Sequence, residues 1–452
     1  MAESSVFKQN VDRVVNDTDF LRKMEARYDF FRMVAKNRAS HYSDFELEKS
    51  RAFNIRNKTF RNYDKLLVDF ETNCVANGVV VKWARDAEEA KQMIYEIISE
   101  EKAKNVIKTK NNVAEEIGLL SYLEMKKVNV TETDSGDFVC YAENERPSDL
   151  QHSAAHLTYN EISERFTEKF SVQQNLKPKQ LMTVVHKVLK NKYLNADFAI
   201  TGANFIISDT GSIIFSENEG NVLKSIASAK KHIVLTGIDK LVASLEDMST
   251  LLPLSSIFEV SKNRVSAIYT ILNKPDFLIL VDNGRSDILE KEYQRQIFTC
   301  IECGACNNVC PIFNVIGGHV YEMAIPGPVG TVVKPIVEGF EKASHFATLC
   351  TSCHQCDDIC PINIKISDLI LRNRMDVVGE NDSLIDERNI FNFMIKKVEN
   401  RKAMDKKNVL INLQYKQLMK KNWGLKRAVP VFAEKTFSQL WKEANGIKEN
   451  LS

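Results

Sequence analysis

The sequence predicts an α/β domain with a mostly parallel sheet, followed by an α-helical domain that carries most of the cysteines and by a helical, basic tail. Between residues 106 and 282, short β-rich runs alternate with helical ones, which is typical of a parallel sheet covered by helices. From about residue 286 the sequence becomes helical and is interrupted by two cysteine-rich motifs. A chain of 452 residues is long enough for two or three such domains.

The composition is that of a soluble globular protein. Apolar residues make up 44% and charged residues 27% of the chain, and the formal net charge is +1. A charge so close to zero gives no overall attraction to nucleic acid or to a membrane surface, so we expect no nucleic-acid partner. The N-terminus has no apolar segment behind a basic start, and no run of about 18 apolar residues occurs. We therefore expect a cytoplasmic protein with no transmembrane segment.

The N-terminal region, 1–105, is expected to be mostly helical, with one short strand at 78–84. The helix after this strand has apolar residues at helical spacing with charges between them, namely Ala87, Ala90, Met93, Ile94, Ile97 and Ile98. The core of the α/β domain is expected at 106–285. Its β-rich runs are 128–134, 138–143, 198–220, 232–242 and 277–284.

The rest of the chain divides into a cysteine-bearing helical domain at 286–376 and a basic helical region at 377–452. The Pro and Gly residues of 325–330 predict an irregular loop between the two cysteine motifs. Residues 395–427 carry eleven Lys or Arg against two acidic residues. Two interpretations of this stretch stay open. One is a solvated surface, and the other is a surface for an acidic partner or for anionic lipid, which would allow peripheral contact with a membrane.

Eight of the ten cysteines occur in two copies of the pattern Cys-x-x-Cys-x-x-Cys-x-x-x-Cys-Pro, at 300–311 and 350–361. This spacing is typical of bacterial ferredoxins with two 4Fe-4S clusters, in which the fourth cysteine of each run binds the other cluster. We therefore assign cluster 1 to Cys300, Cys303, Cys306 and Cys360, and cluster 2 to Cys350, Cys353, Cys356 and Cys310. Crossed ligation holds the two clusters close together, as electron transfer requires.

Structural zinc is the alternative for these cysteines, because paired Cys-x-x-Cys units also bind zinc. Zinc has no use for a third Cys-x-x step, and a disulfide framework is not expected in a reducing compartment. Gly304 lets backbone amides approach the sulfur atoms of cluster 1, whereas His354 takes this position in the second repeat, so the clusters are expected to differ in potential. Cys74 and Cys140 stand alone and are interpreted as buried core thiols.

Glycine-rich loops at the predicted ends of strands are candidates for a ligand pocket. They place five polar residues beside glycines: Asn204, Asp209, Thr210, Glu219 and Asn221. Open α/β sheets bind ligands at such strand ends, and a small carboxylate, a phosphate or a coenzyme is a candidate substrate here. The alternative is that these are ordinary turn residues. No Gly-x-Gly-x-x-Gly or phosphate-binding Gly-Lys-Ser loop occurs, so nicotinamide, flavin and nucleoside triphosphates have no sequence support.

Taken together, these motifs resemble the iron-sulfur subunit of bacterial L-lactate utilisation, the protein B family of that system. The resemblance covers most of the chain. The matching stretches are 112–118, 130–138, 196–221, 232–242, 326–330 and both cysteine motifs.

The resemblance implies a lactate-utilisation domain, similar in fold to the sugar-phosphate isomerase and coenzyme A transferase group, joined to an α-helical ferredoxin domain. It also implies two partners, a cysteine-rich subunit and a subunit with only the lactate-utilisation domain, which together oxidise L-lactate to pyruvate. The chain departs from the family pattern at Asp149, where a histidine is usual, whereas His156 matches a second family histidine. The stretch 216–220 resembles the segment with the glutamate nucleophile of coenzyme A transferases, but Glu219 interrupts that match.

These observations predict the iron-sulfur electron-transfer subunit of a complex that oxidises L-lactate to pyruvate. No motif for an organic hydride acceptor occurs in the chain, so the chemistry is expected at a shared or neighbouring site. Two alternatives stay open. One is a redox sensor or scaffold whose clusters are structural, and the other is a transferase or isomerase that acts through the α/β domain.

Overall fold

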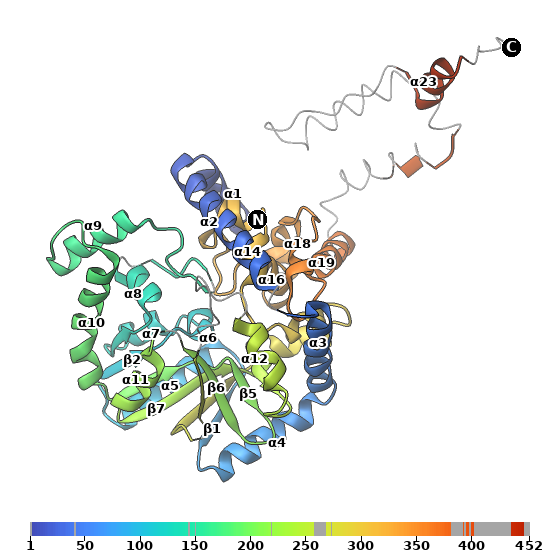
Figure 1. Cartoon of the computed structure of the whole chain (residues 1–452). Helices are drawn as coiled ribbons and strands as arrows, with labels where there is room; N and C mark the ends of the chain where they lie inside the picture. Colours follow the sequence, from blue (N-terminus) through green and yellow to red (C-terminus); the bar gives the residue numbers. More distant parts are fainter. Residues whose placement is uncertain are drawn as a thin grey trace. The chain divides into compact units, whose positions relative to one another are not determined.

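The chain forms two compact units, Met1–Arg374 and Met375–Ser452, and each is described by itself. Figure 1 shows the computed structural model, which describes residues 2–39, 42–142, 145–149, 151–217, 219–256, 268–272, 274–380, 392, 395–396, 399–401 and 435–446. In the second unit it describes helix α23 (Phe437–Ala444), whereas most of the basic stretch 395–427 lies outside the described residues. No helix in the described ranges is long and apolar enough to cross a membrane.

Six parallel strands form the central sheet of the first unit, in the order β1-β10-β7-β4-β2-β3. Their bounds are β1 (Val80–Ala84), β2 (Asn105–Lys108), β3 (Asn129–Glu132), β4 (Phe198–Thr201), β7 (Lys231–Gly237) and β10 (Phe277–Val281). The mostly parallel sheet expected from the sequence is therefore confirmed. The strand expected at 78–84 corresponds to β1, which pairs with β10 from the other end of the domain.

Alternate residues of the central strands face two separate apolar cores. Ile233 and Leu235 of β7 belong to one core, and Val234 between them belongs to the other. Because both faces are covered, the middle strands read as nearly continuous apolar runs. The first core is covered by α5 (Ala87–Glu100), α6 (Asn112–Glu116) and α7 (Leu119–Met125), and the second by α4 (Tyr63–Ala76).

A smaller sheet contributes to the second core, with the order β8-β5-β6-β9. Its strands are β5 (Phe205–Ile207), β6 (Ser212–Glu217), β8 (Leu241–Val242) and β9 (Ile268–Leu272). Strands β5 and β6 form an antiparallel hairpin. The remaining helices of this region are α8 (Ser135–Ala142), α9 (Tyr159–Phe170), α10 (Pro178–Leu194), α11 (Asn221–Ser228), η1 (Ile238–Lys240) and α12 (Met248–Ser256).

The cysteine-bearing region is a set of short helices that packs against the N-terminal helices. Helices α1 (Ala2–Val15) and α2 (Thr18–Ala39) contact α15, while α3 (Phe45–Arg61) contacts η2. Helix α2 also contacts α14, and Figure 1 shows these two helices together. The elements are α13 (Arg285–Glu290), η2 (Gln294–Thr299), α14 (Ala305–Val309), α15 (Phe313–Ile316), η3 (His319–Tyr321), α16 (Gly327–Val337), α17 (Phe340–Ala343), η4 (Ser344–Thr348), α18 (Gln355–Ile359) and α19 (Ile366–Glu380). The N-terminal helices are therefore held against the region that carries the cysteines.

Two local expectations were wrong. The run 138–143 was expected to be β-rich, but it lies mostly in helix α8. The carboxylate of Asp134 accepts hydrogen bonds from the backbone amides of Gly136 and Asp137, which starts the helix. The irregular loop expected at 325–330 ends at Pro326, because Gly327 already begins α16.

Candidate metal centres and the adjoining cavity

The two cysteine repeats fold into loops with matching backbone conformations. Positive φ angles occur at Glu302 (53°) and Gly304 (71°) in the first loop, and at Ser352 (55°) and His354 (60°) in the second. The third cysteine of each repeat then lies on α14 or α18, and these two helices contact each other. The two loops therefore present their cysteines in the same way.

Cysteines from both repeats are neighbours in space. One small cavity is lined by Cys300, Cys303, Cys306 and Cys360. Burial raises the pKa of Cys310 to about 11, and the neighbouring thiols of Cys350 and Cys353 act in the same direction. The pKa of Cys356 is raised by burial and then by Asp357, Cys310 and Cys350. The structure thus brings Cys360 to the first repeat and Cys310 to the second.

The loops offer the groups that hold a 4Fe-4S cluster. The backbone amides of Glu302 and Ser352 donate to the sulfurs of Cys300 and Cys350, each at 3.3 Å. In the cavity of the first repeat, the side-chain nitrogen Nδ2 of Asn307 is buried and has no hydrogen-bond partner among the described residues. Such donors suit cluster sulfur atoms. Burial raises the pKa of Cys300 to about 12, which favours the protonated thiol, whereas a bound metal ion would stabilise the thiolate.

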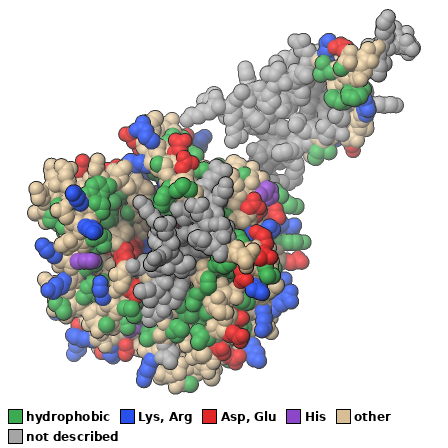
Figure 2. All heavy atoms as spheres, viewed as in Figure 1, with side chains coloured by type: hydrophobic (Ala, Val, Ile, Leu, Met, Phe, Trp, Pro, Cys, Tyr) green, Lys and Arg blue, Asp and Glu red, His purple; other side chains and the backbone are tan. Residues whose placement is uncertain are grey.

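The two loops differ in exposure. In the first loop, Ile301 and Gly304 are buried. In the second loop, Ser352, Cys353 and His354 are exposed. The site formed around the first repeat is therefore enclosed by the protein, whereas the second repeat reaches the surface. On the face drawn in Figure 2, basic and acidic side chains of the first unit are interspersed, which agrees with the formal net charge of +1.

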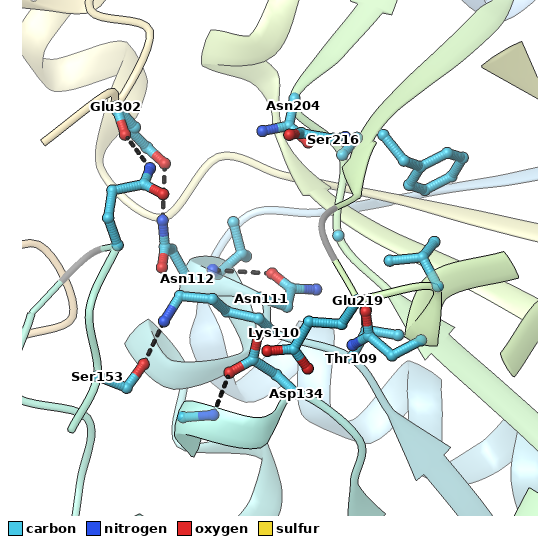
Figure 3. A pocket seen from close by; sticks show the side chains of 18 of the residues that line it. Thr109, Lys110, Asn111, Asn112, Asp134, Ser153, Asn204, Ser216, Glu219 and Glu302 are labelled. Atoms are coloured by element: carbon cyan, nitrogen blue, oxygen red, sulfur yellow. Dashed lines mark hydrogen bonds between the residues drawn. The ribbon is translucent and has the colours of Figure 1, made fainter. Parts of the chain in front are cut away.

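A polar cavity of about 570 Å³ lies beside the first cysteine loop, at the carboxyl ends of the parallel strands. Its lining includes residues that follow β2, β3 and β4, namely Thr109, Lys110, Asn111, Asn112, Asp134, Ser135, Gly202 and Asn204. Another part of the lining is Ile301 and Glu302, from between the first two cysteines. Figure 3 shows Asn112 hydrogen-bonded to Glu302, and Lys110 to Ser153.

Three of the five residues predicted for a ligand pocket line this cavity: Asn204, Glu219 and Asn221. The oxygen Oδ1 of Asn204 accepts from the amide of Ser216 at 2.7 Å, and Glu219 accepts from the amide of Ser135 at 3.1 Å. Their positions are therefore fixed by the hairpin and by the start of α8.

Asp209 and Thr210 lie elsewhere, in the turn between β5 and β6. The carboxylate of Asp209 accepts from the amide of Leu245 at 3.3 Å, and the carbonyl of Thr210 accepts from the side chain of Asn77 at 3.1 Å. Neither residue lines the polar cavity. Their role in the structure is that of turn residues, which hold the hairpin against neighbouring segments.

Several ionisable residues of the cavity were not predicted from the sequence. Lys110 donates to Asp137 at 3.1 Å and to Ser153, and burial together with Asp137 raises the pKa of Asp134 to about 6. His152 stacks on Phe31 with ring centroids 4.7 Å apart, and burial lowers the pKa of His152 to about 4. Its Nε2 is buried without a partner among the described residues. The polar run directly after β2 was a signal that could have found Lys110.

Glu302 connects the cavity with the first cysteine loop. Its carboxylate forms an ion pair with buried Lys240 and accepts from Asn112 at 3.0 Å. Its carbonyl accepts from Gln151 at 2.9 Å. Lys240 also pairs with Asp239 at 3.0 Å. The segment between Cys300 and Cys303 is therefore held against the α/β domain from several directions.

Comparisons with known proteins agree with this architecture. A family model described as "LUD domain" matches residues 67–276, which contain β1 to β9, and one described as "4Fe-4S dicluster domain" matches 296–364, which contain both cysteine repeats. The chain is 30% identical to lactate utilization protein B of Oceanobacillus iheyensis, over 98% of each chain. The chain belongs to the lactate utilization protein B family.

Other members of the lactate utilization protein B family give the same result. The member from a Geobacillus species is 35% identical over 72% of this chain and 70% of its own length. The member from Bacillus subtilis is 31% identical over 83% of this chain and 80% of its own length. The resemblance stated from the sequence is confirmed, as is the expected combination of an α/β lactate-utilisation domain with an iron-sulfur domain.

The residue at which this member of the lactate utilization protein B family departs from the expected pattern is buried. Asp149 forms an ion pair with Arg27, and both side chains are nearly inaccessible. His156, at the expected second histidine, lies 2.9 Å from the hydroxyl of Ser148 and 3.1 Å from the carboxylate of Glu145. Neither lines the polar cavity.

Proposed function

We propose that this chain is the iron-sulfur electron-transfer subunit of a complex that oxidises L-lactate to pyruvate in the cytoplasm. Its partners are a cysteine-rich subunit and a subunit with only the lactate-utilisation domain. The observation that carries the proposal is that Glu302 lines the polar cavity and stands between two cysteines of the first repeat. A ligand in the cavity and a redox centre in the loop would thus be neighbours.

The proposal includes two 4Fe-4S clusters with crossed ligands. Cys300, Cys303, Cys306 and Cys360 would hold cluster 1, and Cys350, Cys353, Cys356 and Cys310 would hold cluster 2. Such clusters supply one-electron transfer when bound. The cavity that the first four residues share, and the raised pKa of Cys310 beside Cys350 and Cys353, support this assignment.

The polar cavity is proposed to take a small hydroxy acid or a related small molecule. Its lining offers amide groups from Asn111, Asn204 and Asn221 and the ammonium group of Lys110. These groups suit a ligand with hydroxyl and carboxylate oxygens, whereas the carboxylates of Asp134 and Glu219 suit hydroxyl donors. The basic stretch 395–427 remains a proposed contact for an acidic partner or anionic lipid.

The first test is the metal content and the lactate-dependent reduction of the purified protein. Oxygen-free material should contain about eight irons and as many acid-labile sulfides per chain. We expect lactate to bleach the cluster absorbance only when both partner proteins are present. Zinc in place of iron would refute the proposal. If neither lactate with the partner proteins nor a low-potential donor reduces the clusters, the redox sensor or scaffold would be favoured.

A second test separates electron transfer from chemistry in the α/β domain alone. A variant with all eight repeat cysteines changed to serine should lose every lactate-dependent redox activity. If it kept a transferase or isomerase activity, the α/β domain would act independently of the clusters.

Substitution of Cys310 tests the crossed ligands. We expect Cys310→Ser to alter the electron paramagnetic resonance signal of the cluster held by Cys350, Cys353 and Cys356, because Cys310 lies beside these residues. Cys140→Ser is the matched control, since Cys140 is a buried thiol outside both repeats. Loss of the cluster that Cys300 and its neighbours bind would contradict the assignment.

A further inference from the structure

Asn307 and Asp357 occupy the same position in the two repeats, directly after the third cysteine. Both side chains are buried, with 1% and 2% of their surface exposed. The oxygen Oδ1 of Asn307 lies 3.8 Å from Sγ of Cys306, and Oδ1 of Asp357 lies 3.6 Å from Sγ of Cys356. The two proposed cluster sites therefore differ by one buried carboxylate at a matched place.

Asn307 can donate to its cysteine. Its nitrogen Nδ2 is buried and has no partner among the described residues, and the side chain lines the cavity of the first repeat. The side chain is confined, because a Cβ added at Gly327 would lie 2.0 Å from Oδ1. A ligated thiolate has no proton to give to Oδ1 of Asn307. Rotation of the amide by half a turn places the nitrogen toward the sulfur and makes the hydrogen bond.

Asp357 is held as an acceptor. Its Oδ1 accepts from the amide of Ser367 at 2.8 Å, and its Oδ2 accepts from the hydroxyl of Ser367 and lies 3.0 Å from Nδ1 of His354. A carboxylate has no hydrogen to donate to the sulfur of Cys356. Its negative charge opposes the negative charge that a cluster gains on reduction, and a buried charge is weakly screened.

We infer that Asn307 and Asp357 set the order of the two cluster potentials, with cluster 1 above cluster 2. This inference rests on the proposed two-cluster function. Hydrogen bonds to sulfur and the net charge near a cluster are among the factors that determine its potential. The greater exposure of the second loop acts in the opposite direction, but the carboxylate is buried beside the ligand sulfur, where water does not reach it.

The order of potentials has a consequence for the reduced protein. The first electron resides on cluster 1, whose loop lines the polar cavity. Cluster 2, which has the exposed Cys353 among its proposed ligands, then remains oxidised at the surface. The residue after the third cysteine of each repeat thus contributes to a thermodynamic difference between the enclosed and the exposed site.

The test is a redox titration of the full-length, anaerobically prepared protein, followed by electron paramagnetic resonance. We expect Asp357→Asn to raise the lower of the two midpoint potentials by about 59 mV. For a one-electron couple, this is about a tenfold change in the ratio of reduced to oxidised cluster. Asp358→Asn is the matched control, because it removes the same charge from the exposed next residue. It should leave both midpoints in place.

The reciprocal variant is Asn307→Asp, which should lower the upper midpoint. If this variant loses iron, the Asp357→Asn result decides alone. The inference is overturned if the wild-type midpoints coincide, if Asp357→Asn moves the upper midpoint, or if it moves neither more than Asp358→Asn does. Wild-type protein that holds zinc or a single cluster would overturn the proposed function itself, which iron and sulfide analysis reveals before any titration.

Discussion

Replacement of Arg27 should release helix α2 from the cysteine-bearing region. The guanidinium of Arg27 forms a buried ion pair with Asp149 and donates to Asn308 at 3.2 Å and Asn314 at 3.1 Å. It also lies 5.3 Å from the ring centroid of Phe313. In Arg27→Met the carboxylate of Asp149 stays buried without its cation, and such a loss costs about 3–5 kcal/mol.

Hydrogen exchange of α2, measured by mass spectrometry on the anaerobically prepared protein, reports the free-energy cost of losing Arg27. Each 1.4 kcal/mol changes an equilibrium constant about tenfold. A cost of about 3 kcal/mol to the local opening of α2 therefore lowers the protection of its amides from exchange by about 100-fold or more. Arg22→Met is the matched control on the same helix, because the Arg22–Asp19 pair is 79% and 75% exposed and such pairs contribute about 0–1 kcal/mol.

The double variant Arg27→Met/Asp149→Leu separates the unpaired charge from lost packing. It should recover part of the protection, because apolar residues can replace a buried ion pair at little cost. The reasoning is refuted if Arg27→Met lowers the protection of α2 no more than Arg22→Met does. Iron analysis of each variant shows whether the clusters are kept.

Two further predictions concern the α/β domain, and denaturant unfolding measures both. Burial lowers the pKa of His232 to about 4. The unfolded chain therefore binds a proton that the native state does not, and stability should fall by about 3 kcal/mol as pH drops from about 6.5 to about 4. His232→Asn should reduce this loss, whereas the exposed His186→Asn should keep it. Gly211→Ala should lower the free energy of unfolding by more than Gly118→Ala does. Both glycines have positive φ, but of the two only Gly211 would place the new Cβ against backbone, 2.8 Å from the nitrogen of Cys74. Equal effects of the paired variants would contradict these predictions.

The sequence predicted the features that depend on short-range spacing. Cysteine spacing identified both repeats, and glycines beside strand ends identified Asn204 and Asn221 as residues of the cavity. Lys110 was missed because a lysine in a polar run is usually a surface residue, and its position in the cavity wall depends on a hydrogen bond to Asp137 from another segment. Glu302 was also missed, because its place in the cavity wall depends on how the cysteine-bearing region packs against the α/β domain.

The run 138–143 was mistaken for a strand because its residues favour strands by local propensity. Val139 and Cys140 are indeed buried, but they lie in helix α8. The cap from Asp134, which lies outside the run, starts that helix. Here a hydrogen bond at the helix start and tertiary packing outweighed propensity.

The place of Glu302 determines which variants distinguish ligand binding from electron transfer. Glu302 lines the polar cavity and a second cavity of about 420 Å³, and it lies next to Cys303 in sequence. A change at Glu302 therefore affects both cavities and the first cysteine loop at the same time. Asn204 lines the polar cavity, and Asp357 is buried beside Cys356 in the other repeat. Because Asn204 lies in the LUD domain and Asp357 in the 4Fe-4S dicluster domain, Asn204→Ala should weaken lactate-dependent reduction without moving a midpoint potential, and Asp357→Asn should do the reverse.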